Sequence, residues 1–199
     1  MAGVDLRLTA WHLPAGQADA LLERGAARIR SHAGDAVYGE GTDDLAAVVL
    51  EAARQRGLRI VVAESCTGGL VGGRLTETPG SSDVVESGVV CYSYASKTRL
   101  LGVPADLVEG HGAVSEAVAR KMAEGALERL GGDLSISVTG IAGPGGGTPE
   151  KPVGTVWFAT AMGEDVRATR IVFFGTRGEV RARAAQTALR LLLGRLRER

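Results

Sequence analysis

The spacing of apolar and polar positions predicts alternating strands and helices over most of the chain. A continuous apolar run at 59–63 is typical of a strand covered on both faces. Strands are predicted at 59–63, 88–94, 134–139, 153–161 and 166–174, the last two close enough to form a hairpin. Helices are predicted at 45–56, 68–77, 97–101, 116–130 and from about 178 to the end. This order indicates a three-layer α/β/α sandwich on a mixed sheet.

The first 41 residues differ from the remainder in pattern. Apolar residues alternate over 4–10, recur at helical spacing over 17–31, and form a short run at 36–38. A strand, a helix and a second strand are therefore expected. About 40 residues form only a marginal core by themselves. We interpret 1–41 as a small α+β appendage joined to a main domain over 42–199.

Composition narrows the possible partners. The 199 residues include 23 basic and 23 acidic side chains, so no net field attracts nucleic acid or an anionic membrane. No apolar run approaches the ~18–20 residues that a membrane span needs. Cys66 and Cys91 cannot form a disulfide framework, which favours a reducing cytoplasm. Three isolated histidines argue against a metal site built from histidine, and we expect no metal.

The first candidate site is the stretch AESCTGG at 63–69, where a buried strand gives way to a helix. Ligands of open α/β sheets bind at the carboxyl ends of strands, and a helix N-terminus offers free N–H groups to an anion. Ser65 would present its hydroxyl there, while Gly68 and Gly69 would let a ligand approach the backbone. The alternative is that Ser65 or Thr67 only caps the helix.

A serine nucleophile needs a base, and no histidine lies in that part of the chain. The nearest suitable group is Lys97 in YSYASK at 92–97, because a desolvated lysine loses proton affinity. A tyrosine beside a Ser–Lys pair can relay protons. The alternatives are a solvated lysine, and packing roles for Tyr92 and Tyr94. Cys66 is a rival nucleophile, or else a small buried residue.

A third candidate is the stretch TGIAGPGGG at 139–147, which fits neither the Walker A nor the dinucleotide pattern. Its backbone could supply N–H donors to an oxyanion or phosphate, or it is a plain flexible loop.

Ser115 is better interpreted as a helix N-cap than as a ligand contact. Arg177 could bind a phosphate or carboxylate, or be merely exposed. The C-terminal arginines are read as a solvated helix face: Arg190, Arg195, Arg197 and Arg199.

Six strings occur together in order: AESCTGG, YSxxxK, HGAVSE, GIAGPGGG, KPVGTVWFA and FxGxRxxVR, the last at 173–181. Over 42–199 the chain resembles the CinA C-terminal domain, the nicotinamide-nucleotide amidohydrolase family. Residues 1–41 resemble the tail of the small domain that precedes it in longer CinA proteins. The family pattern usually reads Gly-Asp-Arg where this chain has Gly175-Thr176-Arg177, which places the orientation of the arginine in question.

The resemblance implies deamidation of nicotinamide mononucleotide to nicotinate mononucleotide and ammonia, without metal or cofactor. Ser65 would be the nucleophile, Lys97 its general base and Tyr92 the third catalytic member. The implied substrate-binding residues are Thr67, Gly68, Gly69, Ser115, Thr139, Gly140 and Arg177. A homodimer or larger homo-oligomer is also implied. A non-catalytic interaction module linked to competence or DNA damage, and an amidase acting on a related amide, are the alternatives.

Overall fold

The computed structural model describes residues 4–41 and 43–198. The chain divides between Asp43 and Asp44 into two compact units, and each is treated separately below.

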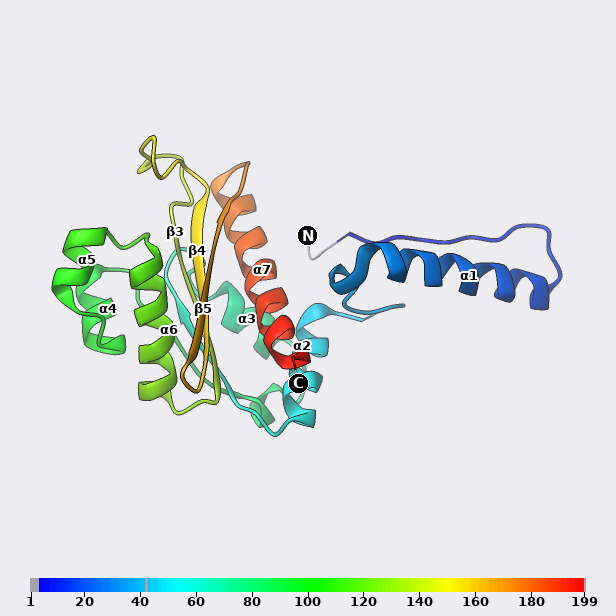
Figure 1. Ribbon diagram of the computed structural model, residues 1–199, viewed down its shortest axis with the longest axis horizontal. Coiled ribbons are helices and arrows are strands. Elements are labelled where there is room, and N and C mark those ends of the chain that lie inside the picture. The colour runs from blue at the N-terminus through cyan, green and yellow to red at the C-terminus, as the bar shows by residue number, and fades with distance from the viewer. Residues whose placement is uncertain (1–3, 42, 199) are drawn as a thin grey trace. The chain divides into compact units, whose positions relative to one another are not determined.

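The N-terminal unit is built on one helix, α1 (Ala15–Ala33), followed by a single 3-10 turn, η1 (Gly34–Ala36). Residues 4–14 run extended along α1 (Figure 1), and the Leu8 side chain lies against Gly25 of that helix. The helix was predicted correctly, but the strands expected at 4–10 and 36–38 are wrong. A strand requires a hydrogen-bonded neighbour, and the described residues of this unit hold an extended segment against a helix instead.

The main unit is organised around a mixed five-stranded sheet in the order β2-β1-β3-β4-β5. Its strands are β1 (Ile60–Glu64), β2 (Val85–Val90), β3 (Leu134–Gly140), β4 (Thr155–Met162) and β5 (Asp165–Val172). β1 pairs in parallel with β2 and β3, whereas β3, β4 and β5 are antiparallel neighbours. The mixed sheet and its terminal hairpin are as predicted. β2 ends earlier than expected, so residues 91–93 form a loop at the sheet edge.

Helices cover both faces of the sheet (Figure 1). One layer contains α2 (Leu45–Gln55), α3 (Leu70–Thr76) and α7 (Arg177–Arg197), and the short turn η2 (Ser81–Asp83) follows α3. The other layer contains α4 (Tyr94–Leu101), α5 (Ala105–His111) and α6 (Glu116–Leu130). The predicted three-layer sandwich is confirmed. The sequence pattern missed α5, because its seven residues bury only Val108 and show no periodicity.

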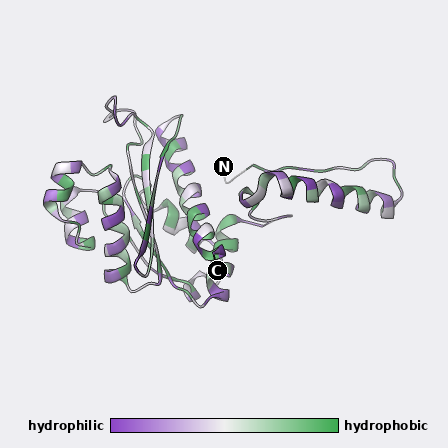
Figure 2. Ribbon diagram, in the orientation of Figure 1, coloured by the Kyte–Doolittle hydropathy of each residue, from purple (hydrophilic) through white to green (hydrophobic). Residues whose placement is uncertain are grey.

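The core fixes the distance between the α4–α6 layer and the sheet. Figure 2 shows hydrophobic residues running through the central strands, with mixed hydropathy along α6 and α7. Two buried hydroxyls on β3, from Ser135 and Ser137, donate to backbone carbonyls of α6 at 2.8 and 2.6 Å. Gly125 of α6 touches α4, since a Cβ there would lie 1.8 Å from the Leu101 carbonyl oxygen. α4 is therefore held close to α6.

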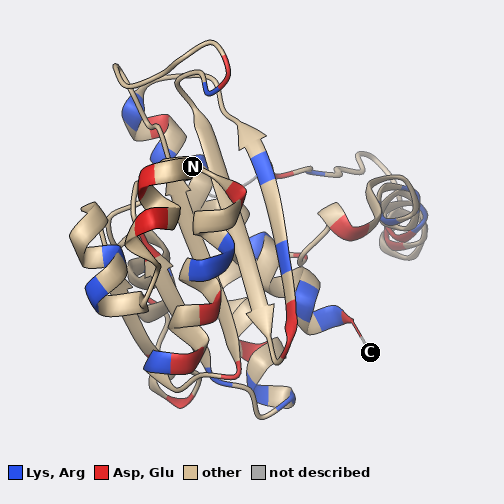
Figure 3. Ribbon diagram, turned by 60° about the vertical axis from the view of Figure 1, so that its left-hand side comes forward, with Lys and Arg blue, Asp and Glu red and all other residues tan. Residues whose placement is uncertain are grey.

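The end of the sheet opposite the candidate site carries charged pairs. Figure 3 shows basic residues spaced along the edge strand β5, a pattern that discourages strand addition. Arg195 of α7 is only 3% exposed and pairs with Asp165 at 3.1 Å. The reading of the C-terminal arginines as a solvated face is thus wrong for Arg195, whose stem packs in the core, and Arg199 lies outside the described residues. No described helix is long and apolar enough to cross a bilayer.

Candidate active site

Ser65 follows β1 directly and continues its pairing, since its N–H donates to the Val138 carbonyl at 2.9 Å. Its hydroxyl projects toward the α4 layer and is almost enclosed, with the residue 7% exposed. The N-cap of helix α3 is instead Gly69, which has a left-handed backbone (φ 97°) and no side chain of its own. The alternative in which Ser65 or Thr67 merely caps the helix is therefore wrong.

Lys97 is the partner of this hydroxyl. Its Nζ lies 3.0 Å from Ser65 Oγ, 2.8 Å from the Cys91 carbonyl oxygen and 3.3 Å from the Tyr92 carbonyl oxygen. The side chain has no exposed surface, so the solvated alternative is wrong. Burial lowers the pKa of Lys97 below its ordinary value. The amine thus meets three oxygen atoms, two of carbonyls and one of a hydroxyl, and its neutral form has a lone pair that can accept the serine proton.

The sequence also offered Cys66 as a rival nucleophile. Cys66 is 4% exposed, and burial raises the pKa of its thiol to about 11. Burial also raises the pKa of Cys91. Because the thiolate is the reactive form, Cys66 is a weak nucleophile near neutral pH. Its alternative reading, a small buried residue, is confirmed.

Tyr92 contributes to the site through two different groups. Its carbonyl accepts from Lys97, whereas its ring is 57% exposed and its Oη accepts from Arg177 Nη2 at 2.8 Å. Arg177 Nη1 also donates to the Gly143 carbonyl at 2.9 Å. The phenol is thus tied to Arg177, and the expected packing of Tyr92 and Tyr94 in the core is wrong, since both are exposed.

Arg177 is oriented by the start of α7. Thr176 is the N-cap: its hydroxyl accepts from the Glu179 N–H, and the Glu179 carboxylate accepts from the Thr176 N–H at 2.7 Å. This reciprocal arrangement is a capping box. Threonine therefore fills the capping role that the family's aspartate could fill, so the departure at this position leaves the helix start intact.

Three of the expected binding residues lie at the end of β3 and the start of α6. Thr139 is buried and donates to the Ala113 carbonyl at 2.8 Å, which ties the end of β3 to the loop before α6. At Gly140 a Cβ would lie 2.7 Å from the Val156 side chain, so the residue is small in order to admit β4. The N-cap role predicted for Ser115 is confirmed, because its hydroxyl accepts from the Val118 N–H.

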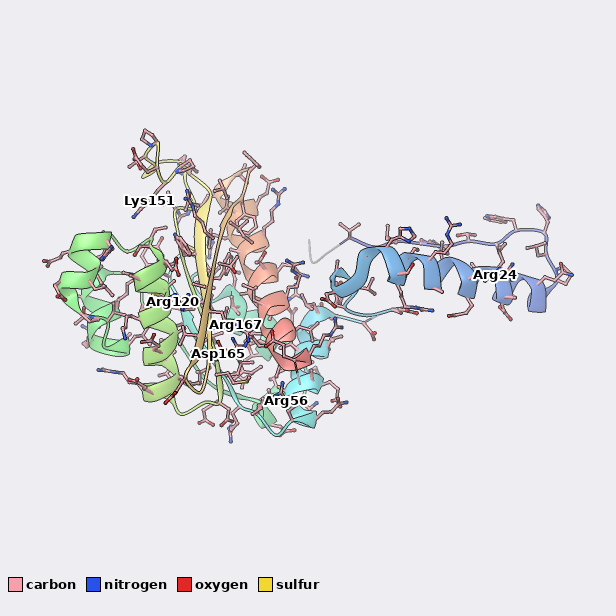
Figure 4. The ribbon with its side chains drawn as sticks, viewed as in Figure 1. Arg24, Arg56, Arg120, Lys151, Asp165 and Arg167 are labelled. Carbon is pink, nitrogen blue, oxygen red and sulfur yellow. The ribbon has the colours of Figure 1, made fainter. Side chains whose placement is uncertain are left out.

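The glycine-rich loop between β3 and β4 carries Lys151 (Figure 4), which ties the loop to the end of α5. Lys151 Nζ donates to the His111 carbonyl at 2.8 Å. Among the described residues neither Lys151 nor Arg177 forms an ion pair, so both cations face neutral oxygen atoms. The loop is therefore more than a plain flexible connection, because Lys151 holds it to the end of α5 and brings a positive charge that has no acidic partner in the described part of the chain.

Sequence reasoning missed Glu64, although it lies within the AESCTGG stretch. Its carboxylate is 2% exposed and accepts from the N–H groups of Gly69, Val71 and Gly72 at 2.8–3.1 Å. The prediction that the helix N-terminus offers these groups to an anion is wrong, since the protein's own carboxylate neutralises that positive end. The sequence signal that could have revealed this role is an acidic residue shortly before the glycine-rich start of a helix.

Arg181 was also missed, although it ends the FxGxRxxVR string. Its Nε donates to the Cys66 carbonyl at 3.1 Å and its Nη2 to the Thr67 carbonyl at 2.8 Å. Arg181 lies one helical turn after Arg177 and therefore on the same face of α7. That spacing was the available signal. Arg177 thus holds the glycine-rich loop, and Arg181 of the same helix holds the turn that follows Ser65.

The described residues contain no group of three or more His, Cys, Asp or Glu side chains placed to hold a metal ion. What they bring together is an enclosed hydroxyl, a buried amine within hydrogen-bonding distance and nearby cationic groups. Such a set can carry out nucleophilic acyl transfer to serine.

Comparisons with known proteins agree on one family. The model of the CinA C-terminal domain matches residues 42–196. A CinA-like protein of Gemmatimonas aurantiaca is 57% identical over 187 residues, which are 94% of this chain and 44% of that protein. A CinA-like protein of Chlorobaculum tepidum is 48% identical over 202 residues, covering 99% and 48%. The chain therefore spans less than half the length of these relatives.

Solved structures show the same fold. The competence/damage inducible protein of Agrobacterium tumefaciens has a TM-score of 0.75 and 42% identity, with 77% of this chain and 94% of that one covered. A CinA superfamily protein of Klebsiella pneumoniae has a TM-score of 0.74 and 37% identity, with 76% and 95% covered.

Proposed function

This chain belongs to the CinA C-terminal domain family, and from that premise we propose that it hydrolyses the carboxamide of nicotinamide mononucleotide to nicotinate mononucleotide and ammonia. The observation that carries the proposal is the enclosed pair of Ser65 and Lys97, 3.0 Å apart. An amine that is buried beside a hydroxyl, with a lowered pKa, is the arrangement that a serine nucleophile requires.

The first half of the reaction forms an acyl-enzyme. Ser65 Oγ attacks the carboxamide carbon while neutral Lys97 accepts the hydroxyl proton, giving a tetrahedral oxyanion. The Lys97 ammonium then donates a proton to the amide nitrogen, the C–N bond breaks and ammonia leaves. An ester between Ser65 and the nicotinoyl group remains.

The second half uses the same base. Lys97, neutral again, takes a proton from water, and the resulting hydroxide attacks the ester carbonyl. The new tetrahedral oxyanion collapses, Ser65 regains its proton from Lys97, and nicotinate mononucleotide is released. Every proton movement in this scheme goes through Lys97 Nζ, so the scheme does not use the Tyr92 phenol, which is tied to Arg177, as the third catalytic member that the resemblance implied. The scheme uses only side chains and water.

The substrate's phosphate explains the cationic surroundings. Arg177 and Lys151 have neutral partners, so an incoming phosphate can bind either without displacing a carboxylate. Arg177 is the better candidate, because its planar fork can hold two phosphate oxygens at once. This recognition would favour the nucleotide over free nicotinamide.

A cytoplasmic location and a homodimer or larger assembly stay predictions, as does the origin of residues 1–41 in a preceding domain.

An ammonia-release assay tests the proposal. Purified chain is incubated with nicotinamide mononucleotide, with nicotinamide riboside and with free nicotinamide, and Ser65→Ala serves as the blank. We expect ammonia from the mononucleotide and far less from the other two. Ammonia from a different amide alone would move the assignment to another amidase. If no amide is hydrolysed, the proposal fails and the non-catalytic interaction module takes its place.

A further inference from the structure

The backbone turn that carries the nucleophile is held from both ends by buried or partly buried charges. The Gly68 N–H donates to the Ser65 carbonyl at 3.1 Å, which closes the turn. Glu64 holds the amides that follow it, beginning at Gly69. Arg181 holds the carbonyls of Cys66 and Thr67, the two residues between. The carbonyls of Ser65, Cys66 and Thr67 therefore each accept a hydrogen bond.

Arg181 also dictates where one amide of the turn points. The Cys66–Thr67 peptide is trans, so its N–H points away from its C=O. Because the Cys66 carbonyl faces Arg181 of α7, the Thr67 N–H faces the opposite direction. The Ser65 hydroxyl also lies on that opposite side, where it meets Lys97 of α4. The Thr67 amide and the reactive hydroxyl therefore point toward the same face of the sheet.

The Thr67 side chain reinforces this orientation. It has no exposed surface, and its residue is linked by its own carbonyl to Arg181 Nη2 at 2.8 Å. Rotating the Cys66–Thr67 peptide would turn the Cys66 carbonyl away from Arg181 and break that contact. Donors that are held in place before the reaction stabilise a developing oxyanion most strongly, because they need not reorganise.

We infer that Arg181 is a positioning residue that aims the Thr67 N–H at the oxyanion formed when Ser65 attacks an amide carbonyl. The inference rests on the proposed function in requiring Ser65 to be the nucleophile, but it does not depend on the identity of the amide. Arg181 itself lies behind the turn and does not touch the reacting atoms. Lysine lacks the planar fork that fixes the two nitrogen donors of Arg181 relative to each other, so Arg181→Lys should hold the two carbonyls less rigidly.

A fluorophosphonate probe tests the inference without the natural substrate. Ser65 Oγ forms a bond to phosphorus, the P–F bond breaks, fluoride leaves and the hydroxyl proton passes to Lys97, while the phosphoryl oxygen occupies the oxyanion position. The rate of Ser65 labelling is measured over a series of pH values below 10.5, the ordinary pKa of lysine, because burial lowers the pKa of Lys97. Ser65→Ala, which cannot be labelled, defines the background.

For Arg181→Lys we expect labelling to slow by about 100-fold at every pH, as for loss of one oxyanion donor. The pH midpoint should stay that of the unaltered chain, because Lys97 is untouched. Arg190→Lys, an exposed position on the same helix, is the matched control and should label normally. Unaltered labelling of Arg181→Lys would overturn the inference. So would a shifted midpoint, which would mean that Arg181 acts through Lys97.

Two further measurements keep the outcomes separate. Thermal unfolding shows whether each variant is folded, and Arg181→Gln, which keeps one donor, replaces Arg181→Lys if the latter does not fold. Deamidation of nicotinamide mononucleotide is measured in parallel. A chain that is labelled at Ser65 yet does not deamidate the mononucleotide refutes the proposed function, while the labelling rates still decide the role of Arg181.

Discussion

Lys97 Nζ lies 3.0 Å from Ser65 Oγ, and the two residues are separated by 32 positions in the sequence. The contact depends on the end of β1 and the first turn of α4 meeting at the same edge of the sheet. Both side chains are buried, so the amine has exchanged water for two carbonyls and a hydroxyl. This environment is the basis for our proposal that Lys97 is the base and Ser65 the nucleophile.

The pH dependence of turnover should report the titration of Lys97. Below its pKa Lys97 is an ammonium ion and cannot accept the serine proton; above it the amine is free. Because burial lowers this pKa from 10.5, kcat should rise with pH and level off below that value. Lys97→Met should abolish the rise. A rise that continues to about 11 would instead match the Cys66 thiol and contradict the assignment.

Removing the Arg177 guanidinium should weaken binding of the nucleotide more than it slows the chemical step. Hydrogen bonds to a charged group contribute about 1.5–3 kcal/mol, so Arg177→Ala should raise KM for nicotinamide mononucleotide roughly 10- to 100-fold. KM for nicotinamide riboside, which lacks the phosphate, should change little. Steady-state kinetics on both substrates, with Arg190→Ala as control, measures this difference. Equal effects on the two substrates would remove Arg177 from phosphate recognition.

The capping box at the start of α7 makes a prediction about stability. Thr176→Ala removes the side-chain oxygen that accepts from the Glu179 N–H and should cost about 1 kcal/mol of unfolding free energy. Thr176→Asp restores an acceptor of the kind found in the family pattern and should unfold near the unaltered chain. Urea unfolding followed by circular dichroism compares the three. An equal loss in both variants would mean that capping is not what this position supplies.

Two glycines on helices should respond in opposite directions to alanine. At Gly125 the added Cβ meets the Leu101 carbonyl, so α6 and α4 must separate at a cost of about 1–3 kcal/mol. Lys97 moves with α4, and turnover should fall as well. At Gly194 of α7 nothing lies within 4 Å, and Gly194→Ala should gain about 0.5–1 kcal/mol. Thermal unfolding of the two variants, together with kcat, tests this packing; stabilisation by Gly125→Ala would contradict it.

The sequence predicted the main sheet well because its strands are short apolar runs separated by periodic helices. It failed at residues 4–10, where alternation was present but the structure provides a helix, not a strand, as neighbour. It found Ser65 and Lys97 because a nucleophile and base are recognisable residue types. Glu64 and Arg181 were overlooked because their contacts are with backbone groups, and no residue-type pattern reveals which carbonyl or amide a side chain will meet.

Trapping the covalent intermediate tests the central claim most directly. The chain is mixed with nicotinamide mononucleotide, quenched in acid within a turnover and digested, and the peptide carrying Ser65 and Cys66 is sequenced by mass spectrometry. The account predicts a nicotinoyl mononucleotide ester on Ser65, absent from Ser65→Ala and retained in Cys66→Ala. A thioester on Cys66, or ammonia release by Ser65→Ala at the unaltered rate, would contradict it.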